Sequence, residues 1–125
     1  MRIVKSRRLV DNRDLLERTQ RFSETILEVA VELPKNSINN VLVGQTIRAV
    51  TSVGANYREG CEAESSKDFV HKIRISKKEA RESHYWLTLL FRANPGFASK
   101  IKPLIDDSME LVKIFSTIVK KFQNH

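Results

Sequence analysis

The sequence has little cysteine, glycine, proline and tryptophan. One cysteine, one tryptophan, four glycines and three prolines occur among its 125 residues. The single thiol, Cys61, cannot form a disulfide within the chain, which fits the reducing cytoplasm. The scarcity of glycine and proline argues against extended disorder. We therefore expect an ordered cytoplasmic protein without internal disulfides.

Residues that could hold a metal are also scarce. Of the three histidines, His71 and His84 are far apart in one predicted helix, and His125 is the last residue. Metal sites on a helix normally use ligands three or four residues apart, and no Cys/His cluster has the spacing of a zinc site. We expect neither a metal nor another cofactor.

Long apolar runs are missing. Residues 1–14 are too charged for a signal peptide. The longest nearly uncharged segment, residues 36–57, has Arg48 as its one charged residue, but its asparagines and glutamine make it a poor membrane span. We therefore expect neither export by a signal peptide nor insertion into a membrane.

The composition is that of a globular protein with a basic surface. Hydrophobic residues make up 41% and charged residues 30% of the chain, and the net charge is +7. Residues 1–125 suffice for a single domain with its own core. The positive charge would raise the local concentration of polyanions such as nucleic acids, but it does not prove that any is bound.

Apolar residues recur at spacings of three and four, which predicts helices and no strand. After a basic arm at 1–12, we predict helices at about 13–32, 37–63, 66–92 and 99–123, with Pro103 in the first turn of the last. The predicted N-caps are Asp11 or Asn12, Ser37, and Ser65 or Ser66. Short turns between long helices predict an all-α, antiparallel up-down-up-down four-helix bundle.

The same spacing gives the apolar faces of the helices. The first two helices would bury Leu15, Phe22, Ile26, Val29 and Leu33, and Leu42, Val43, Ala49, Val50 and Val53. The third would bury Phe69, Ile73, Ser76, Ala80, Ser83, Leu87 and Leu90. The fourth would bury Ile101, Leu104, Ile105, Ser108, Leu111, Val112, Phe115, Ile118, Val119 and Phe122. Gly44, Gly54 and Gly60 could let neighbouring helices approach the second one closely.

Five polar residues fall on one side of the second predicted helix, within a wedge of roughly 80°. They are Gln45, Arg48, Ser52, Asn56 and Glu59. Glu79 and Glu82 of the third helix could supply carboxylates opposite Arg48, and Trp86 could anchor a helix or subunit contact. We call this set the polar seam: Gln45, Arg48, Ser52, Asn56, Glu59, Glu79, Glu82 and Trp86.

The polar seam is open to two interpretations. As an active site it would need a nucleophile beside a base, which these residues do not provide. As an internal or inter-subunit network it would fix register, because buried charges must be paired. We favour the second, and we predict no catalytic residues. The second helix also needs more cover than three partner helices usually give, which favours a cyclic oligomer over a monomer.

The third predicted helix carries a run of cations opposite its apolar face. We call it the basic stripe: Lys67, His71, Arg74, Lys78 and Arg81, with Lys77 at its edge. Arg7 and Arg8 add a basic arm. These residues could contact phosphates on successive turns, or they could simply be a solvated face and a frayed terminus. Tyr85 is the only aromatic residue near the stripe, so any binding would be electrostatic and sequence-tolerant.

A string of motifs resembles a known family. The string comprises Gln45, Arg48-Ala49, Ser52, Ala55-Asn56 and Glu59-Gly60, then Ser66-Lys67-Asp68-Phe69, Lys78-Glu79-Ala80-Arg81-Glu82 and Tyr85-Trp86-Leu87. Over residues 13–123 the chain resembles the bacterial four helix bundle protein family, which includes proteins encoded in intervening sequences of large-subunit ribosomal RNA genes. A more distant relative is the accessory variability protein of diversity-generating retroelements. The resemblance implies an antiparallel bundle, a homopentamer and no known catalytic activity.

These observations lead to a ranked set of hypotheses. The first is a non-enzymatic, oligomeric bundle that binds RNA or DNA through charge. The alternative is a scaffold that binds a partner protein without nucleic acid. An enzyme that uses Arg48 and the glutamates would require an accessible pocket beside them.

Overall fold

The computed structural model describes residues 12–123, with side chains from 14 to 123. Over this range the chain forms four α helices and no strand, so the predicted all-α class is confirmed. The helices are α1 (Asn12–Glu32), α2 (Ser37–Cys61), α3 (Ser66–Ala93) and α4 (Ala98–Gln123), and a short 3-10 turn, η2 (Pro95–Phe97), precedes α4. The basic arm with Arg7 and Arg8, and His125, lie outside the described residues.

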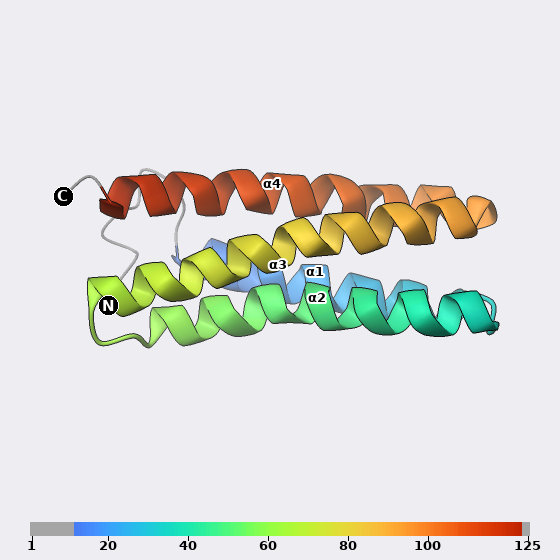
Figure 1. Cartoon of the computed structure of the whole chain (residues 1–125), viewed down its shortest axis with the longest axis horizontal. Coiled ribbons are helices and arrows are strands. Elements are labelled where there is room, and N and C mark those ends of the chain that lie inside the picture. Colours follow the sequence, from blue (N-terminus) through green and yellow to red (C-terminus); the bar gives the residue numbers. More distant parts are fainter. Residues whose placement is uncertain (1–11, 124–125) are drawn as a thin grey trace.

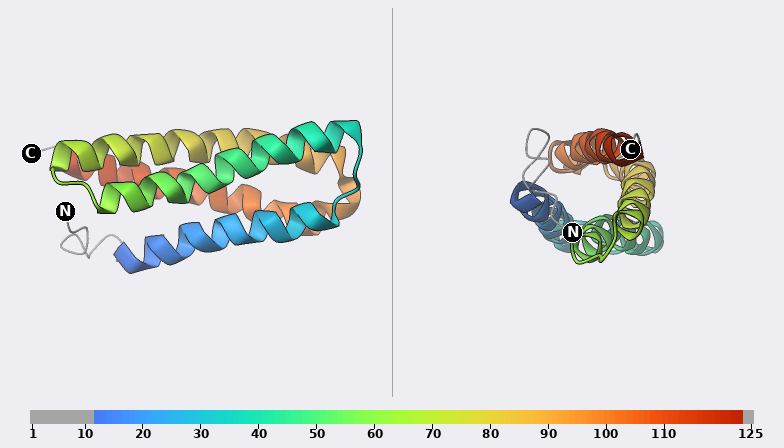
Figure 2. Two further views of the ribbon diagram at one scale, coloured as in Figure 1. Left: turned by 90° about the horizontal axis from the view of Figure 1, so that it is seen from below. Right: turned by 90° about the vertical axis from the view of Figure 1, so that its left-hand side faces the viewer.

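The four helices lie side by side, and successive helices run in opposite directions (Figure 1). Viewed end-on, they surround a common interior (Figure 2). α3 packs extensively against both α2 and α4, whereas α1 packs mainly against α2. The sequence segments that carry the polar seam, α2 and α3, are therefore direct neighbours.

Two helix ends differ from the prediction. The N-cap of α2 is Asn36, not Ser37: its extended backbone lets the side chain accept the backbone N–H of Asn39 at 2.8 Å. At the other end of α2, the N–H of Glu62 bonds to carbonyls of the last turn, so the helix stops at Cys61 rather than 63. Ser65, one of the two predicted candidates, caps α3 by accepting the N–H of Asp68 at 3.1 Å.

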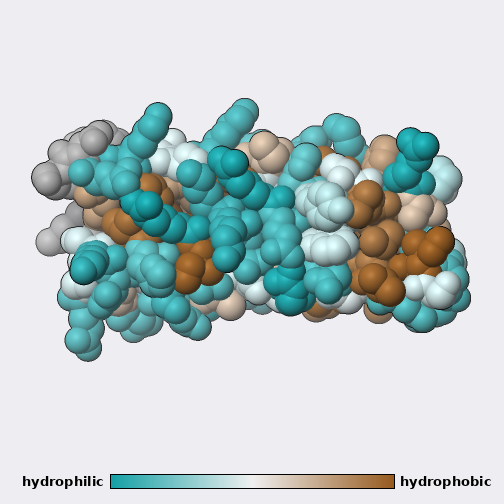
Figure 3. All heavy atoms as spheres, viewed as in Figure 1, coloured by the Kyte–Doolittle hydropathy of each residue, from teal (hydrophilic) through white to brown (hydrophobic). Residues whose placement is uncertain are grey.

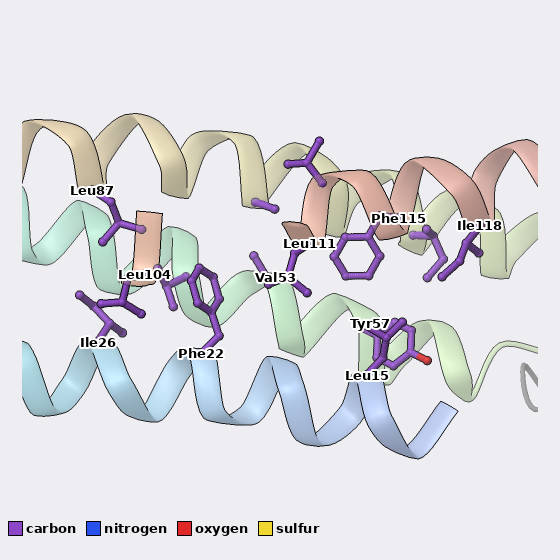
Figure 4. Close-up of a cluster of buried hydrophobic side chains, with 14 of the residues drawn as sticks. Leu15, Phe22, Ile26, Val53, Tyr57, Leu87, Leu104, Leu111, Phe115 and Ile118 are labelled. Atoms are coloured by element: carbon purple, nitrogen blue, oxygen red, sulfur yellow. The ribbon is translucent and has the colours of Figure 1, made fainter. Parts of the chain in front are cut away.

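The predicted apolar faces of α1 and α3 are confirmed residue by residue, because every predicted core position on them is buried. On α2 and α4 the faces are confirmed except at their rims, where Leu42, Val43, Ile105 and Phe122 are only partly buried. The core also contains Tyr57, which the sequence analysis missed (Figure 4). Its ring centroid lies 6.1 Å from that of Phe115.

Two glycines of α2 permit close helix contacts, as the sequence suggested. A Cβ at Gly54 would lie 3.2 Å from Thr19 Cβ of α1, and one at Gly60 would lie 3.1 Å from Lys72 Cβ of α3. The expectation is wrong for Gly44 within the chain, since a Cβ there would meet nothing within 4 Å. Pro103 also differs, because α4 begins at Ala98 and the proline lies past its first turn.

A buried amide pair joins the start of α2 to the end of α3. The Nδ2 group of each residue, Asn39 and Asn94, donates to the Oδ1 atom of the other at 2.9 Å. The same two groups also donate to the carbonyls of Pro34 and Leu90, at 2.9 and 3.0 Å. Both asparagines are buried, so each depends on the other for hydrogen bonds that water cannot supply.

We expect Asn94→Ala to lower the free energy of unfolding by about 1–3 kcal/mol, because it leaves the Asn39 amide buried with a missing partner. Urea denaturation measures this. Asn40→Ala is the matched control, since Asn40 is the exposed neighbour of Asn39 on α2 and its loss should change stability by about 0.5 kcal/mol or less. Equal effects of the two substitutions would contradict the role given to the pair.

Candidate nucleic-acid interface and polar seam

Five residues of the polar seam lie close together around Arg48, where α2 faces α3. Its guanidinium donates to Gln45 Oε1 at 3.1 Å and to Glu79 Oε1 at 3.4 Å, and it pairs closely with Glu82. Trp86 Nε1 donates to the same Glu82 oxygen that accepts from Arg48, at 2.9 Å. The structure thus brings together five of the predicted seam residues.

The remaining seam residues behave differently. Ser52 and Asn56 hydrogen-bond to carbonyls one turn earlier on their own helix, at 2.7 and 2.9 Å. Glu59 reaches α3 and pairs with Lys72 Nζ at 2.5 Å. Lys72 was missed, although a register that sets Arg48 opposite Glu82 in an antiparallel pair also sets Glu59 opposite Lys72.

The seam lies at the surface of the chain rather than in its core. The side chain of Arg48 is 46% exposed and that of Glu79 is 14% exposed. An exposed ion pair of this kind contributes about 1 kcal/mol or less to stability. The side chains are already paired with each other, so they can orient a contact, but they form no arrangement that activates a nucleophile.

The basic stripe is exposed along α3. Its five residues lie on one outward face, and Lys77 at the edge is half-buried. From Lys67 to Arg81 the stripe spans about 21 Å along the helix axis. Among residues 14–123, no carboxylate forms a salt bridge with any of these cations, whereas Arg18, Arg48, Lys72, Lys100 and Lys102 are each paired. The stripe is therefore an exposed basic surface without salt-bridge partners among residues 14–123.

The face of the molecule shown in Figure 3 differs between its two ends. In the view of Figure 3, hydrophilic side chains predominate over the left and centre, and apolar side chains gather at the right-hand end, where α2 begins and α3 ends. Ile38 and Val41 of α2 are each 62% exposed at that end. Tyr85, one turn beyond Arg81, is exposed and lies edge-on to Trp86, with ring centroids 5.1 Å apart.

A surface pocket of about 360 Å³ lies where α3 begins and α4 ends. Its lining combines cationic, apolar and polar side chains: Ser66, Lys67, Val70, His71, Arg74, Phe122 and Gln123. Phe122 packs on the buried ring of Phe69, with centroids 5.1 Å apart. The sequence placed three of these residues on the basic stripe, but the pocket also needs the end of α4, which no local pattern relates to the stripe.

Within residues 12–123, no group of three or more His, Cys, Asp and Glu side chains could hold a metal ion. None of the helices in that range has an apolar stretch that could cross a bilayer.

Comparison with known proteins shows the family of the chain and a similar solved structure. Residues 11–117 match the model of the 23S rRNA-intervening sequence protein family. The chain is also similar to a solved structure described as a protein with unknown function from the S23 ribosomal protein family of Bacteroides thetaiotaomicron. The two are 31% identical with a TM-score of 0.73, over 84% of this chain and 97% of that chain. No curated protein matches the chain.

Cys61 is half-buried at the end of α2. Burial raises the pKa of its thiol, and the nearby Glu62 carboxylate adds to this, while a hydrogen bond with Tyr57 acts in the opposite direction. A raised pKa leaves less reactive thiolate at neutral pH, so the environment of Cys61 is that of a packing residue rather than a nucleophile.

We expect iodoacetamide to alkylate Cys61 of the folded protein at pH 8 several-fold more slowly than Cys61 of the same protein in urea. Raising the pH should bring the folded rate toward the unfolded one, because the thiolate forms at higher pH in the folded state. Mass spectrometry measures both rates. Faster reaction in the folded protein would contradict this assignment and mark an activated thiol.

Proposed function

Because the chain belongs to the 23S rRNA-intervening sequence protein family, as its motif string indicated, we propose that it is a non-enzymatic, self-associating bundle that binds RNA. The family name links its members to ribosomal RNA, which supports an accessory role in RNA biology. We further propose that residues 1–125 form one antiparallel up-down-up-down domain, which the alternating helix directions support (Figure 1).

The observation that carries RNA binding is the exposed basic stripe. Cations that lack acidic partners on their own surface release bound counterions when they meet phosphates, and this favours association. The spacing of three and four residues places one basic side chain on each turn of α3, about 5.4 Å apart. A rigid helix therefore presents a row of charges that a phosphate backbone can follow.

The stripe lacks the groups that read sequence. Base readout in single strands relies on aromatic platforms and hydrogen bonds to base edges. Along 67–81 the exposed side chains are mainly flexible cations, and an exposed aromatic appears only at Tyr85, beyond Arg81. We therefore propose sequence-tolerant, electrostatic binding, to DNA as well where its backbone is accessible.

The logarithm of the affinity for single-stranded RNA should fall as the logarithm of the salt concentration rises. We expect the triple variant Arg74→Ala, Lys78→Ala, Arg81→Ala to make this slope less steep by about 2. The loss should be similar for RNAs of different sequence, as measured by fluorescence anisotropy. The matched control removes the same charge from the opposite end of the bundle with Lys35→Ala, Lys100→Ala, Lys102→Ala, which should leave the slope nearly unchanged. Salt-independent or absent RNA binding by the parent protein would refute the proposal.

Self-association is proposed on the outer face of α2 and α3. Ile38 and Val41 lie about three and two turns before Arg48 along α2, and their exposure leaves apolar surface beside the seam. Gly44 lies between them and Arg48 with open space where a side chain would be, so another helix could approach there. A contact between unlike faces of identical chains gives a ring when its rotation closes on itself, and we propose the homopentamer that the family resemblance implies.

Light scattering should give a mass five times the 14.4 kDa of one chain. We expect Val41→Asp to reduce it to that of single chains, because a carboxylate would be buried in the proposed contact. Met109→Asp is the control, since Met109 is an exposed apolar residue on α4, and it should not alter the mass. A parent protein that is a single chain at micromolar concentration would rule out the ring.

A protein-binding scaffold remains the alternative, and one observation favours it. Leu27 and Val31 of α1 are exposed, Val31 to 76%, and could form part of a surface for another chain. The two functions differ in a pull-down from cell extract. A scaffold would keep its partner after nuclease treatment, whereas an RNA-dependent complex would lose it.

A further inference from the structure

The pocket at the start of α3 suggests which part of an RNA strand the protein holds. On the basis of the proposed RNA binding, we propose that this pocket takes a strand end: the terminal nucleotide with its phosphomonoester. Three of its lining residues, Lys67, His71 and Arg74, belong to the basic stripe, so a strand that follows the stripe leads into the pocket.

The lining matches the parts of a nucleotide. Lys67 and Arg74 supply positive charge for a phosphate, and Arg can also bind two phosphate oxygens at once. Val70 and the Phe122 ring supply apolar surface for a base. Ser66 and Gln123 supply hydrogen-bonding groups. The rest of the stripe, Lys78 and Arg81, lies outside this lining and offers charge only.

The charges that precede and follow the pocket along the chain at α3 favour a strand that ends there. Beyond Lys67, toward the connection between α2 and α3, the exposed ionisable residues are Glu62 and Glu64. A phosphate backbone that continued past the pocket would meet these carboxylates, and like charges repel. In the other direction it meets Arg74, Lys78 and Arg81. A strand with its end in the pocket gains the attraction and avoids the repulsion.

The terminal phosphate itself adds to the preference. A phosphomonoester carries about −1.5 to −2 charges near neutral pH, whereas each internal phosphodiester carries one. Cations of the pocket therefore attract the monoester more strongly than an internal phosphate. The lining is compatible with a 5′ or a 3′ phosphomonoester, and the two share the chemistry that the pocket recognises.

The test compares one short single-stranded RNA in four forms: with a 5′ phosphate, with a 3′ phosphate, with hydroxyls at both ends, and circularised. By competition anisotropy we expect at least one phosphorylated form to bind about tenfold more tightly than the hydroxyl and circular forms, as for one additional charge-assisted contact. Which form it is identifies the strand end.

Matched substitutions separate the pocket from the rest of the stripe. Lys67→Ala should remove most of the preference for the phosphorylated end, whereas Arg81→Ala, an equal loss of charge outside the pocket, should weaken all four forms by the same factor. Both residues are exposed, and circular dichroism checks that both variants fold.

The outcomes distinguish this inference from the function on which it rests. Equal affinity for all four RNAs, with the expected salt dependence, overturns the pocket but leaves RNA binding intact. Loss of the end preference in Arg81→Ala together with its retention in Lys67→Ala also overturns the pocket. Absence of binding to every form overturns both.

Discussion

The fixed antiparallel register between α2 and α3 is the constraint on which the other features depend. Hydrogen bonds hold it at both ends and in the middle: Asn39 with Asn94, Ser76 Oγ donating to the Val53 carbonyl at 2.9 Å, and Glu59 with Lys72. The first two contacts are buried, and a slip of one turn would leave their polar groups unsatisfied at about 1–3 kcal/mol each. The same register sets Arg48 against Glu79 and Glu82, so the seam results from the alignment.

With that register set, α3 has three faces with separate tasks. One face packs into the core, a second lies along α2 with the seam, and the third carries the basic stripe. Because the core face is fully buried and the seam face is paired, the basic face must point outward. The backbone of a helix held by two neighbours is rigid, so the attachment points of its basic side chains keep their spacing without the entropic cost of ordering a loop.

The sequence could predict what depends on periodicity within one helix. Spacing gave every apolar core position on α1 and every core position on α3, although it missed the buried Thr19 of α1. The exposed stripe followed as the opposite face of α3. Contacts that depend on register between helices could not be obtained this way. Asn39 and Asn94 are 55 positions apart. In the sequence, Asn39 reads as an ordinary residue near a helix start and Asn94 as an ordinary turn residue before Pro95. Asn36 and Ser37 are both good caps, and only the local backbone decides between them. The pocket needed Phe122, which reads as core.

The seam is polar although its ion pairs add little stability to one chain. Half-exposed ion pairs such as Arg48 with Glu82 contribute about 1 kcal/mol or less. Apolar residues at the same positions would extend the exposed apolar surface formed by Ile38 and Val41, and such a surface promotes unspecific aggregation. Polar groups that already hold each other in place can select one orientation of a neighbouring chain, because any misaligned copy would bury a charge without its partner. In the proposed ring the apolar end of α2 would supply attraction and the seam would supply geometry. The basic face of α3 would then stay free for the proposed polyanion.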